Sequence, residues 1–476
     1  MLREHTEGTL IRDKGRPGRR GFTLPRLDVE ETKVEDILPA SQRRTERPDL
    51  PEVDEPTVVR HYTNLSRKNW GIDTNFYPLG SCTMKHNPRV NEAAAQVPGF
   101  AGLHPMQPQA QSQGALRVMY ELQGFLSEVS GLAAVSLAPL AGAQGELTSI
   151  LMVKRYFEDR GDDKRTTVLV PETAHGTNPA TASMAGFEAE EIGLDEHGCV
   201  DVDELRAKVD ETTAALMITN PNTGGVYERN IAEISEILHE KGAFLYMDGA
   251  NMNANMGRLR AADAGVDVMH FNLHKTFSTP HGGGGPGCGA IACTEELAPF
   301  RPDPVAAKSG DTYSLVKPEK SIGRVTSFFG NFGVMLKAWN YIKLHGPDLR
   351  EVTDMAVLNA NYLRARLREA YRTPYDELCK HEVVIQPPKG KKALDIAKGL
   401  LDHGFHPPTI YFPLVVKEAM LIEPTETESK ETLDDFVEAL LHLAETDDED
   451  LAEAPTTVPT RRLDEARAAR KLKARW

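Results

Sequence analysis

The sequence predicts an α/β fold, with a mostly parallel, doubly wound sheet and a smaller C-terminal α+β domain. Three short apolar runs, at 167–170, 214–219 and 243–247, each end in a loop rich in Gly, Pro or Asn, as buried strands do. Residues 144–160 and the stretch near 230–241 carry apolar residues at helical spacing. Strands that alternate with helices in this way are typical of a parallel sheet covered by helices on both faces.

Changes of pattern along the chain predict four parts. Residues 1–60 are rich in Pro, Arg, Glu and Asp with little apolar periodicity, so we expect an extended arm. Residues 61–336 hold the alternation of strands and helices and form the large α/β domain. Residues 337–450 are expected to form the small α+β domain, and 451–476 a tail whose basic end we interpret as a solvated terminal helix.

The small domain is predicted from helical and apolar runs that follow one another closely. The expected helices and strands are the helical stretches 351–369, 392–403 and 431–445 and the apolar runs 381–386, 409–416 and 419–423. This mixed order indicates a separate α+β unit.

Composition and charge exclude several classes of protein. The chain has 476 residues, 40% apolar and 26% charged, as an ordinary globular protein has. Its formal net charge of −15 argues against nucleic acid or an anionic membrane as the main partner. Neither a membrane helix nor a signal or transit peptide is expected. The five cysteines are scattered and contain no CxxC pair, so we expect no disulfide framework, no metal site and a reducing compartment.

An aspartate and a lysine stand at the ends of two successive apolar runs. Asp248 ends the run at 243–247, and Lys275 follows 27 residues later, just after the next run. Because ligands bind at the carboxyl ends of parallel strands, these two side chains can converge on one ligand. The glycines at 282–285 let backbone pack closely beside the lysine, and Pro280 and Pro286 stiffen the loop. A lysine and a carboxylate placed together suit pyridoxal phosphate.

That cofactor also needs a phosphate cradle, which a helix start with free N–H groups supplies. The best candidate is the Gly-containing turn at 139–149, where the backbone N–H groups of Ala143 and Gln144 would face the phosphate. An ordinary junction between a loop and a helix would have the same appearance.

Two further side chains follow strand ends. His175 comes directly after the run at 167–170 and could stack on the cofactor ring and move protons, although a histidine satisfied within its loop is the alternative. Thr223 could contact the ring oxygen or the phosphate, although turn formation alone explains its Asn-Pro-Asn-Thr-Gly-Gly segment. A dinucleotide-binding loop at the glycine run is rejected, because residues 288–294 read as a strand and not as the required helix.

Six long motifs, in order, resemble one family. They are FYPLGSCTMKHNPRVNE (76–92), PETAHGTNPATA (171–182), DGANMNA (248–254), NLHKTFSTPHGGGGPG (272–287), SIGRVTSFFGNFGV (321–334) and MLIEPTETESKETLDDF (420–436). The chain resembles the glycine decarboxylase P-protein, and more specifically the second subunit of its split, two-chain form, from about residue 60 to 445.

The resemblance implies the architecture of fold-type-I pyridoxal enzymes, with Lys275 as the Schiff-base lysine, Asp248 as the partner of the ring nitrogen and His175 stacked on the ring. It also implies that the enzyme decarboxylates glycine and passes the aminomethyl group to the lipoyl arm of the H-protein. The one-chain form of the family has two related halves, and this chain resembles only the C-terminal, lysine-bearing half. The other half is then expected as a separate chain, subunit 1, in an α2β2 heterotetramer. The N-terminal arm and the segment 328–331 are candidate interface elements, and the split form indicates a prokaryotic cytoplasm.

A decarboxylase must also hold the substrate carboxylate. The candidates are Arg324, His104 and the turn Ser81–Cys82–Thr83. For Arg324, a structural ion pair is the alternative. Two other functions remain open, namely another fold-type-I pyridoxal enzyme, such as an amino-acid decarboxylase or a cysteine desulfurase, and a non-catalytic structural subunit on the same scaffold.

Overall fold

The computed structural model describes residues 10–46, 48–281 and 287–472. The chain divides into two compact units, Met1–Gly71 and Ile72–Trp476. The glycines 282–285 and Pro286, which the sequence places beside the lysine loop, lie outside the described residues. The four-part division expected from the sequence remains a prediction.

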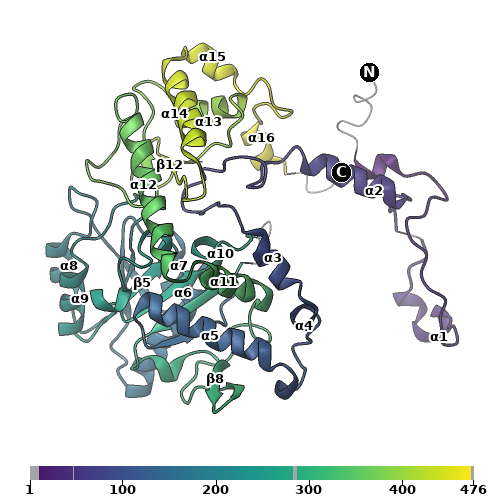
Figure 1. Cartoon of the computed structure of the whole chain (residues 1–476), viewed down its shortest axis with the longest axis horizontal. Helices are drawn as coiled ribbons and strands as arrows, with labels where there is room; N and C mark the ends of the chain where they lie inside the picture. The colour runs from purple at the N-terminus through teal and green to yellow at the C-terminus, as the bar shows by residue number, and fades with distance from the viewer. Residues whose placement is uncertain (1–9, 47, 282–286, 473–476) are drawn as a thin grey trace. The chain divides into compact units, whose positions relative to one another are not determined.

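The N-terminal unit contains short helices joined by extended chain. Its helices, purple in Figure 1, are η2 (Ile11–Lys14), α1 (Val34–Ile37), η3 (Ala40–Gln42) and α2 (Glu55–Ser66). Asp54 caps α2 by accepting a hydrogen bond from the Thr57 N–H at 2.8 Å. Large apolar side chains such as Leu24 are exposed here.

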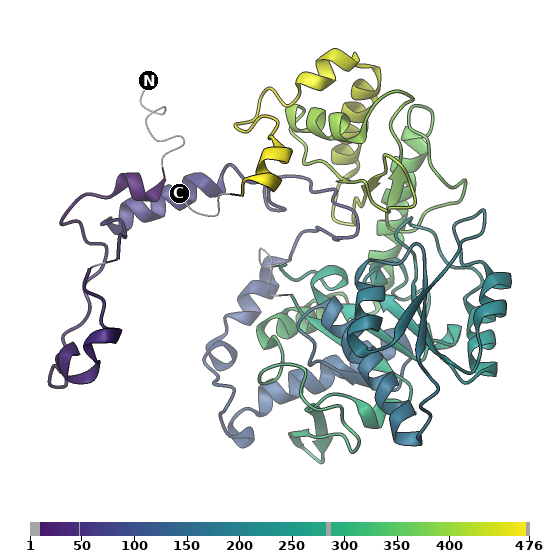
Figure 2. The same ribbon diagram turned by 180° about the vertical axis from the view of Figure 1, so that it is seen from behind.

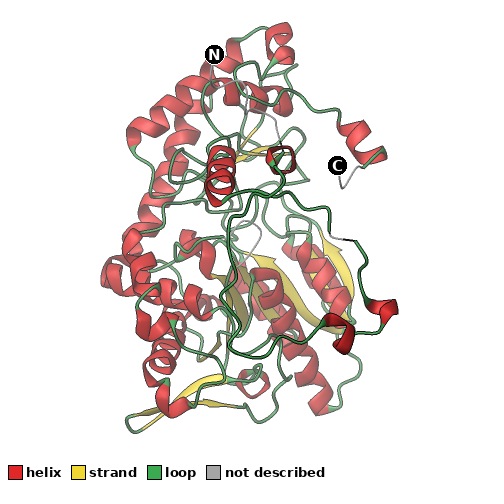
Figure 3. Ribbon diagram, turned by 90° about the vertical axis from the view of Figure 1, so that its right-hand side faces the viewer, coloured by secondary structure: helices red, strands yellow, loops and turns green. Residues whose placement is uncertain are grey.

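A seven-stranded sheet forms the centre of the second unit, in the order β1-β7-β6-β5-β4-β2-β3. The strands are β1 (Ala134–Ser136), β2 (Thr167–Pro171), β3 (Glu188–Ile192), β4 (Thr213–Thr219), β5 (Phe244–Gly249), β6 (Val268–Asn272) and β7 (Gly289–Cys293). Strands β2 to β6 pair in parallel, whereas β7 runs antiparallel to both β6 and β1. Figure 3 shows these strands in yellow between red helices.

The α-helices that accompany this sheet come from the same part of the chain. They are α3 (Arg89–Ala95), α4 (Pro98–Ala101), α5 (Gln113–Ser130), α6 (Gly142–Arg160), α7 (Thr177–Ala185), α8 (Val202–Lys208), α9 (Ile231–Glu240), α10 (Leu273–Thr276) and α11 (Phe332–His345). A hairpin of β8 (Val305–Ser309) and β9 (Thr312–Val316) stands apart from the sheet.

Two hydrophobic cores lie on opposite faces of the sheet, because successive side chains of a strand point to opposite sides. Along β5, Leu245 and Met247 belong to one core. Phe244 and Tyr246 belong to the other. Both faces are therefore buried, which confirms the doubly wound, mostly parallel sheet that the sequence predicts.

The C-terminal part forms a smaller sheet with its own helices. Its elements are α12 (Leu349–Leu367), β10 (Val383–Ile385), α13 (Ala393–Asp402), β11 (Thr409–Ile410), β12 (Met420–Ile422), α14 (Lys430–Glu445), α15 (Asp448–Glu453) and α16 (Glu465–Arg470). The three strands pair antiparallel in the order β10-β12-β11. Figure 2 shows helices of this part in green and yellow.

One strand of the small sheet is shorter than the sequence predicts. The apolar run 409–416 forms a strand only over Thr409–Ile410. Pro413 has no N–H to give to a ladder, and Tyr411 has a positive φ of 59°, so the run turns away instead of extending β11.

Within the described residues, none of the helices has both the length and the apolar character needed to cross a membrane.

Candidate active site

A pocket of about 150 Å³ lies at the carboxyl ends of the central strands. It is lined by Ser81, Gly142, Ala143, Glu146, His175, Thr177, Thr219, Thr223, Asp248, Ala250, Asn251, His270, Asn272 and Lys275. The structure thus gathers into one pocket side chains from segments nearly 200 residues apart.

Lys275 and Asp248 reach this pocket from neighbouring strands. Asp248 lies near the end of β5, is 3% exposed and accepts a hydrogen bond from the Ala250 N–H at 2.9 Å. Lys275 follows β6 within the short helix α10. Strands β5 and β6 pair in parallel, so their ends meet at one edge of the sheet. The aspartate and the lysine therefore converge, as their spacing suggests.

A histidine that the sequence analysis missed stands behind Asp248. His270 is buried on β6, with Nε2 3.4 Å from Asp248 Oδ1 and Nδ1 2.6 Å from the Tyr246 hydroxyl. Burial lowers the pKa of His270, so its ring stays neutral. The only signal in the sequence is a polar residue at the centre of an apolar strand.

The cradle residues lie at the start of α6, which begins at Gly142. The first bond of this turn runs from the Gly145 N–H to the Ala141 oxygen at 3.0 Å, so the N–H groups of Ala143 and Gln144 come before it. Ala143 lines the pocket. The Gln144 side chain instead accepts from the Leu140 N–H at 2.7 Å. Gln144 is not among the residues that line the pocket, so only its backbone N–H is left as a candidate for the phosphate.

Close approach explains the glycine at the helix start. A Cβ atom on Gly142 would lie 2.1 Å from Oδ1 of Asn272, which also lines the pocket. Within the described chain, Asn272 Oδ1 and Thr219 Oγ1 are buried and have no hydrogen-bond partner. Because buried polar atoms are nearly always satisfied, two such atoms in one pocket indicate a polar ligand there.

His175 and Thr223 both line the pocket. His175 follows β2 and is an exposed residue, with its ring 6.0 Å from that of Phe412. Partial desolvation lowers the pKa of His175, against the opposing field of Asp248. Thr223 is buried and its hydroxyl donates to the Thr173 oxygen at 2.8 Å, which leaves the hydroxyl free only as an acceptor.

A second carboxylate, Glu146, was also missed by the sequence analysis. It lies on the first turns of α6 and is 4% exposed. Its oxygens accept from the Thr177 hydroxyl at 2.9 Å and from the Asn178 amide at 3.0 Å. Burial, and then the nearby charge of Asp248, raise the pKa of Glu146 to about 7. The pocket thus contains a carboxyl group that titrates near neutrality.

The candidates for holding a substrate carboxylate separate in the structure. Ser81 lines the pocket beside Lys275. Arg324 and His104 do not; they line a different cavity of about 1000 Å³. Arg324 Nε lies 3.5 Å from Asp303 Oδ2, which fits the alternative of a structural ion pair.

Two buried glutamates next to strands β10 and β12 hold the turn that carries Ser81. Ser81 and Thr83 have positive φ values of 61° and 51°, which non-glycine residues rarely adopt. The Ser81 N–H donates to Glu382 and the Thr83 N–H to Glu423, each at 2.8 Å. Thr83 also donates its hydroxyl to Glu423 at 2.6 Å. These bonds compensate for the strained backbone and fix the turn against the pocket.

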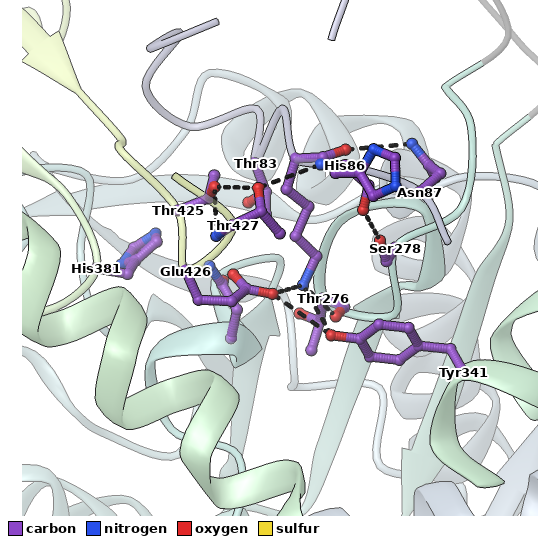
Figure 4. A network of polar contacts seen from close by, with 12 residues as sticks. Thr83, His86, Asn87, Thr276, Ser278, Tyr341, His381, Thr425, Glu426 and Thr427 are labelled. Atoms are coloured by element: carbon purple, nitrogen blue, oxygen red, sulfur yellow. Dashed lines mark hydrogen bonds and ion pairs between the residues drawn. The ribbon is translucent and has the colours of Figure 1, made fainter. Parts of the chain in front are cut away.

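A buried ion pair between Lys85 and Glu426 contacts helix α10, which carries Lys275. Lys85 Nζ donates to the Thr276 carbonyl at 2.9 Å and to Glu426 at 2.7 Å, and lies 3.4 Å from the Tyr341 hydroxyl. Figure 4 shows Thr276, Tyr341 and Glu426 converging on this point. Burial alone would lower the pKa of Lys85, but Glu426 and Tyr341 outweigh it and raise the pKa. Lys85 is therefore a cation that joins Glu426, in the loop after β12, to the residue that follows Lys275.

Fold comparisons place the molecule in a class. The chain resembles a crystal structure of glycine decarboxylase (P-protein) of the glycine cleavage system in inhibitor-bound form, with a TM-score of 0.75 and 22% identity over 86% of this chain and 95% of that one. A cysteine desulfurase from Escherichia coli matches with a TM-score of 0.61 and 16% identity, over 78% of this chain and 96% of that one. The aminotransferase class-V family matches residues 144–310. Fold and pocket together define a fold-type-I pyridoxal-phosphate enzyme.

Sequence comparisons then give the family. Residues 352–464 match the C-terminal domain of glycine dehydrogenase. A "probable glycine dehydrogenase (decarboxylating) subunit 2" from Halalkalibacterium halodurans is 54% identical over 97% of this chain and 96% of its own length. A relative of the same name from Listeria monocytogenes is 52% identical over 97% and 96%. The chain belongs to the glycine dehydrogenase (decarboxylating) subunit 2 family, which confirms the resemblance of its six motifs.

Proposed function

We propose that this chain is the cofactor-bearing subunit of a two-chain glycine decarboxylase, which releases the carboxyl group of glycine as carbon dioxide and passes the aminomethyl group to the lipoyl arm of the H-protein. The observation that carries the proposal is the meeting of Lys275 and Asp248 in one pocket, from the ends of adjacent strands. The names of relatives at 50–54% identity support the same substrate.

Pyridoxal phosphate, when bound, supplies an electron sink for the electron pair left behind by the departing carbon dioxide. Lys275 holds the cofactor. Asp248 keeps a proton on the ring nitrogen, because a buried carboxylate favours a cation beside it. The Ala250 N–H donates to Asp248 Oδ1 at 2.9 Å and fixes the orientation of the carboxylate, and His270 Nε2 lies 3.4 Å from the same oxygen.

The remaining pocket residues orient the two molecules. The N–H groups of Ala143 and Gln144 hold the phosphate at the start of α6. His175, which follows β2, would stack on the cofactor ring, and the Thr223 hydroxyl, which donates to the Thr173 oxygen, would accept a hydrogen bond from the cofactor. Ser81 lines the pocket beside Lys275 and would bind the glycine carboxylate.

Subunit 1 is the proposed partner, in an α2β2 assembly. The cavity of about 1000 Å³ is lined mostly by apolar side chains, and two of them, Met106 and Phe328, are 71% and 46% exposed. Apolar surfaces of this kind mark interaction sites. The segment 328–331 and the N-terminal arm are the proposed interface elements, and we place the assembly in the bacterial cytoplasm, in line with the bacterial relatives.

Reduction with borohydride tests the cofactor assignment. The chain is loaded with pyridoxal phosphate, reduced, digested and mapped by mass spectrometry. We expect the pyridoxyl group on the peptide that contains Lys275, and a glycine-dependent change in the absorption of the unreduced enzyme. A label on other lysines only, or no label, would favour a non-catalytic structural subunit.

Another pyridoxal enzyme of this fold is the remaining alternative. A desulfurase requires a reactive thiolate near the cofactor. Cys82 follows Ser81, which lines the pocket, and burial raises the pKa of the Cys82 thiol. This protonated thiol favours glycine decarboxylation over sulfur transfer. Substrate-dependent spectra with glycine and with cysteine separate the two functions.

A further inference from the structure

His175 is connected to the buried carboxylate Glu146 by a single hydroxyl group. The His175 Nδ1 atom lies 2.8 Å from the Thr177 Oγ1 atom. That same hydroxyl lies 2.9 Å from Oε1 of Glu146. Helices α6 and α7, which carry Glu146 and Thr177, pack against each other, as Figure 1 shows. The chain of contacts thus joins the exposed His175 to the buried Glu146.

The hydroxyl has only one hydrogen, and this fixes the direction of both bonds. An ionised Glu146 can only accept, so Thr177 donates its hydrogen to the carboxylate. The oxygen of Thr177 then accepts from Nδ1 of His175, which must carry a proton. The tautomer of a histidine is set by the bond that its other nitrogen makes, so Nε2 is left with its lone pair.

We propose that Thr177 and Glu146 are positioning residues that hold His175 as the Nδ1–H tautomer, which makes Nε2 the proton-accepting atom at the cofactor ring. The inference rests on the proposed place of His175 in the cofactor site. It assigns a positioning role to Thr177 and Glu146, neither of which needs to touch the substrate.

The surroundings of Glu146 make its hold on Thr177 specific. Its second oxygen accepts from the Asn178 amide at 3.0 Å and lies 3.5 Å from the Thr181 hydroxyl. Oxygen Oε1 is therefore left for Thr177. Bonds to an ionised acceptor are the stronger kind, so the carboxylate controls the hydroxyl hydrogen.

A competing contact favours the opposite tautomer. The backbone N–H of Thr177 donates to Nδ1 of His175 at 3.3 Å, a bond that needs an unprotonated Nδ1. That distance is 0.5 Å longer than the hydroxyl contact. Thr177 is the first residue of α7, so its N–H has no helical partner and loses its acceptor in the Nδ1–H form. The hydroxyl contact is shorter and ends on an ionised acceptor, so it is the stronger of the two and sets the tautomer.

The charge of Glu146 makes the tautomer depend on pH. The groups that face Glu146 are Asp248, His270 and Tyr246 from β5 and β6, and those that face His175 are Asp248 and Lys275. A protonated Glu146 can donate to Thr177, whose hydroxyl then donates to Nδ1 and moves the ring proton to Nε2. Because burial raises the pKa of Glu146 to about 7, the two arrangements exchange near neutral pH.

The matched variants Thr177→Val and Thr177→Ser test the proposal. Valine keeps the shape and removes the hydroxyl, whereas serine restores it. The first readout is the tautomer of His175, from long-range proton–nitrogen correlation spectra of the full chain without cofactor, labelled with 15N-histidine and assigned by a His175→Gln difference spectrum. It does not depend on the cofactor, and borohydride mapping of Lys275 tests the proposed function separately.

At pH 8 we expect the Nδ1–H form in the wild type and in Thr177→Ser, and its loss in Thr177→Val. Lowering the pH to 6 should shift the wild type toward Nε2–H but leave Thr177→Val unchanged. In the assembled enzyme, kcat should fall about 10- to 100-fold in Thr177→Val, with KM little changed and with recovery in Thr177→Ser. An Nε2–H tautomer in the wild type at pH 8, or the same tautomer and kcat in Thr177→Val, would overturn the proposal.

Discussion

The Nζ atom of Lys85 lies 2.9 Å from the carbonyl oxygen of Thr276, directly beside the lysine proposed to hold the cofactor. The same Nζ pairs with Glu426, and both side chains are at least nine-tenths buried. A charge buried in this way is held only by its partner. The stability of the site therefore depends on an ion pair that makes no contact with the pocket itself.

Lys85→Met should lower the free energy of unfolding by about 3–5 kcal/mol, because Glu426 is left buried without a cation. The double variant Lys85→Met/Glu426→Leu should recover most of this loss, since it removes both charges. Urea unfolding of the cofactor-free chain measures the free energy of unfolding of the single and the double variant. Arg206→Met is the control, because the Arg206–Glu233 pair is about half exposed and should contribute less than about 1 kcal/mol. Equal losses for Lys85→Met and Arg206→Met would contradict this account.

Glu146 should make the stability of the chain fall as the pH rises. Burial and the charge of Asp248 raise the pKa of Glu146 from its usual 4.5 to about 7. The folded state therefore binds more protons than the unfolded state between these values, and its stability decreases from about pH 4.5 to about pH 7. The difference in unfolding free energy, Glu146→Gln minus wild type, should rise across this window by up to about 3 kcal/mol and then level off.

The control for that series is Glu204, whose pKa is lowered by its hydrogen bond from Lys208. Glu204→Gln should give a slope of the opposite sign, at lower pH. Thermal unfolding of the cofactor-free chain from about pH 3 to about pH 8 covers both windows, that of Glu204 below pH 4.5 and that of Glu146 above it. A constant difference between Glu146→Gln and the wild type would show that Glu146 keeps an ordinary pKa.

Gly142→Ala should weaken cofactor binding without unfolding the chain. The new Cβ would meet Oδ1 of Asn272 at 2.1 Å, and Asn272 must move out of the pocket. We expect about a tenfold weaker affinity for pyridoxal phosphate, the effect of about 1.4 kcal/mol. Gly124→Ala, in α5, is the matched control, because a Cβ there has no neighbour within 4 Å. Fluorescence titration with the cofactor compares the two, and equal affinities would argue against the cradle at α6.

Asp248→Asn should reduce kcat by about 100-fold or more, because an amide cannot hold a proton on the ring nitrogen by charge. The cofactor should still load onto Lys275, so the absorption of the bound cofactor is measured together with kcat. The Ala250 N–H, which donates to Asp248 Oδ1 at 2.9 Å, can also donate to an amide oxygen at this position. A variant with normal loading and normal kcat would remove Asp248 from the proposed mechanism.

Strand ends were the most informative part of the sequence. Each apolar run that ends in a polar loop marked a place where a side chain could enter the pocket, and Asp248, Lys275, His175 and Thr223 all line it. The same reasoning missed β3, because four of its five residues are exposed and charged or small, so that no apolar run is present. Edge strands of this kind are recognised only from their partners.

The buried polar partners could not be predicted either. Glu146 and His270 have no motif of their own, and their importance comes from Thr177 and Asp248, which approach them only in the folded chain. Arg324 is a candidate for which the structure fits the alternative of an ion pair. As a cation within a long motif it suggested a carboxylate site, but the fold places it in a different cavity, beside Asp303.

Exchange of labelled bicarbonate into the carboxyl group of glycine tests the central claim most directly. The measurement uses the chain assembled with subunit 1 and the lipoylated H-protein, and compares the wild type with Lys275→Ala. We expect glycine-dependent exchange that requires all three proteins and disappears in Lys275→Ala. Exchange that persists in Lys275→Ala, or no exchange by a wild type that carries the cofactor on Lys275, would contradict the proposed function.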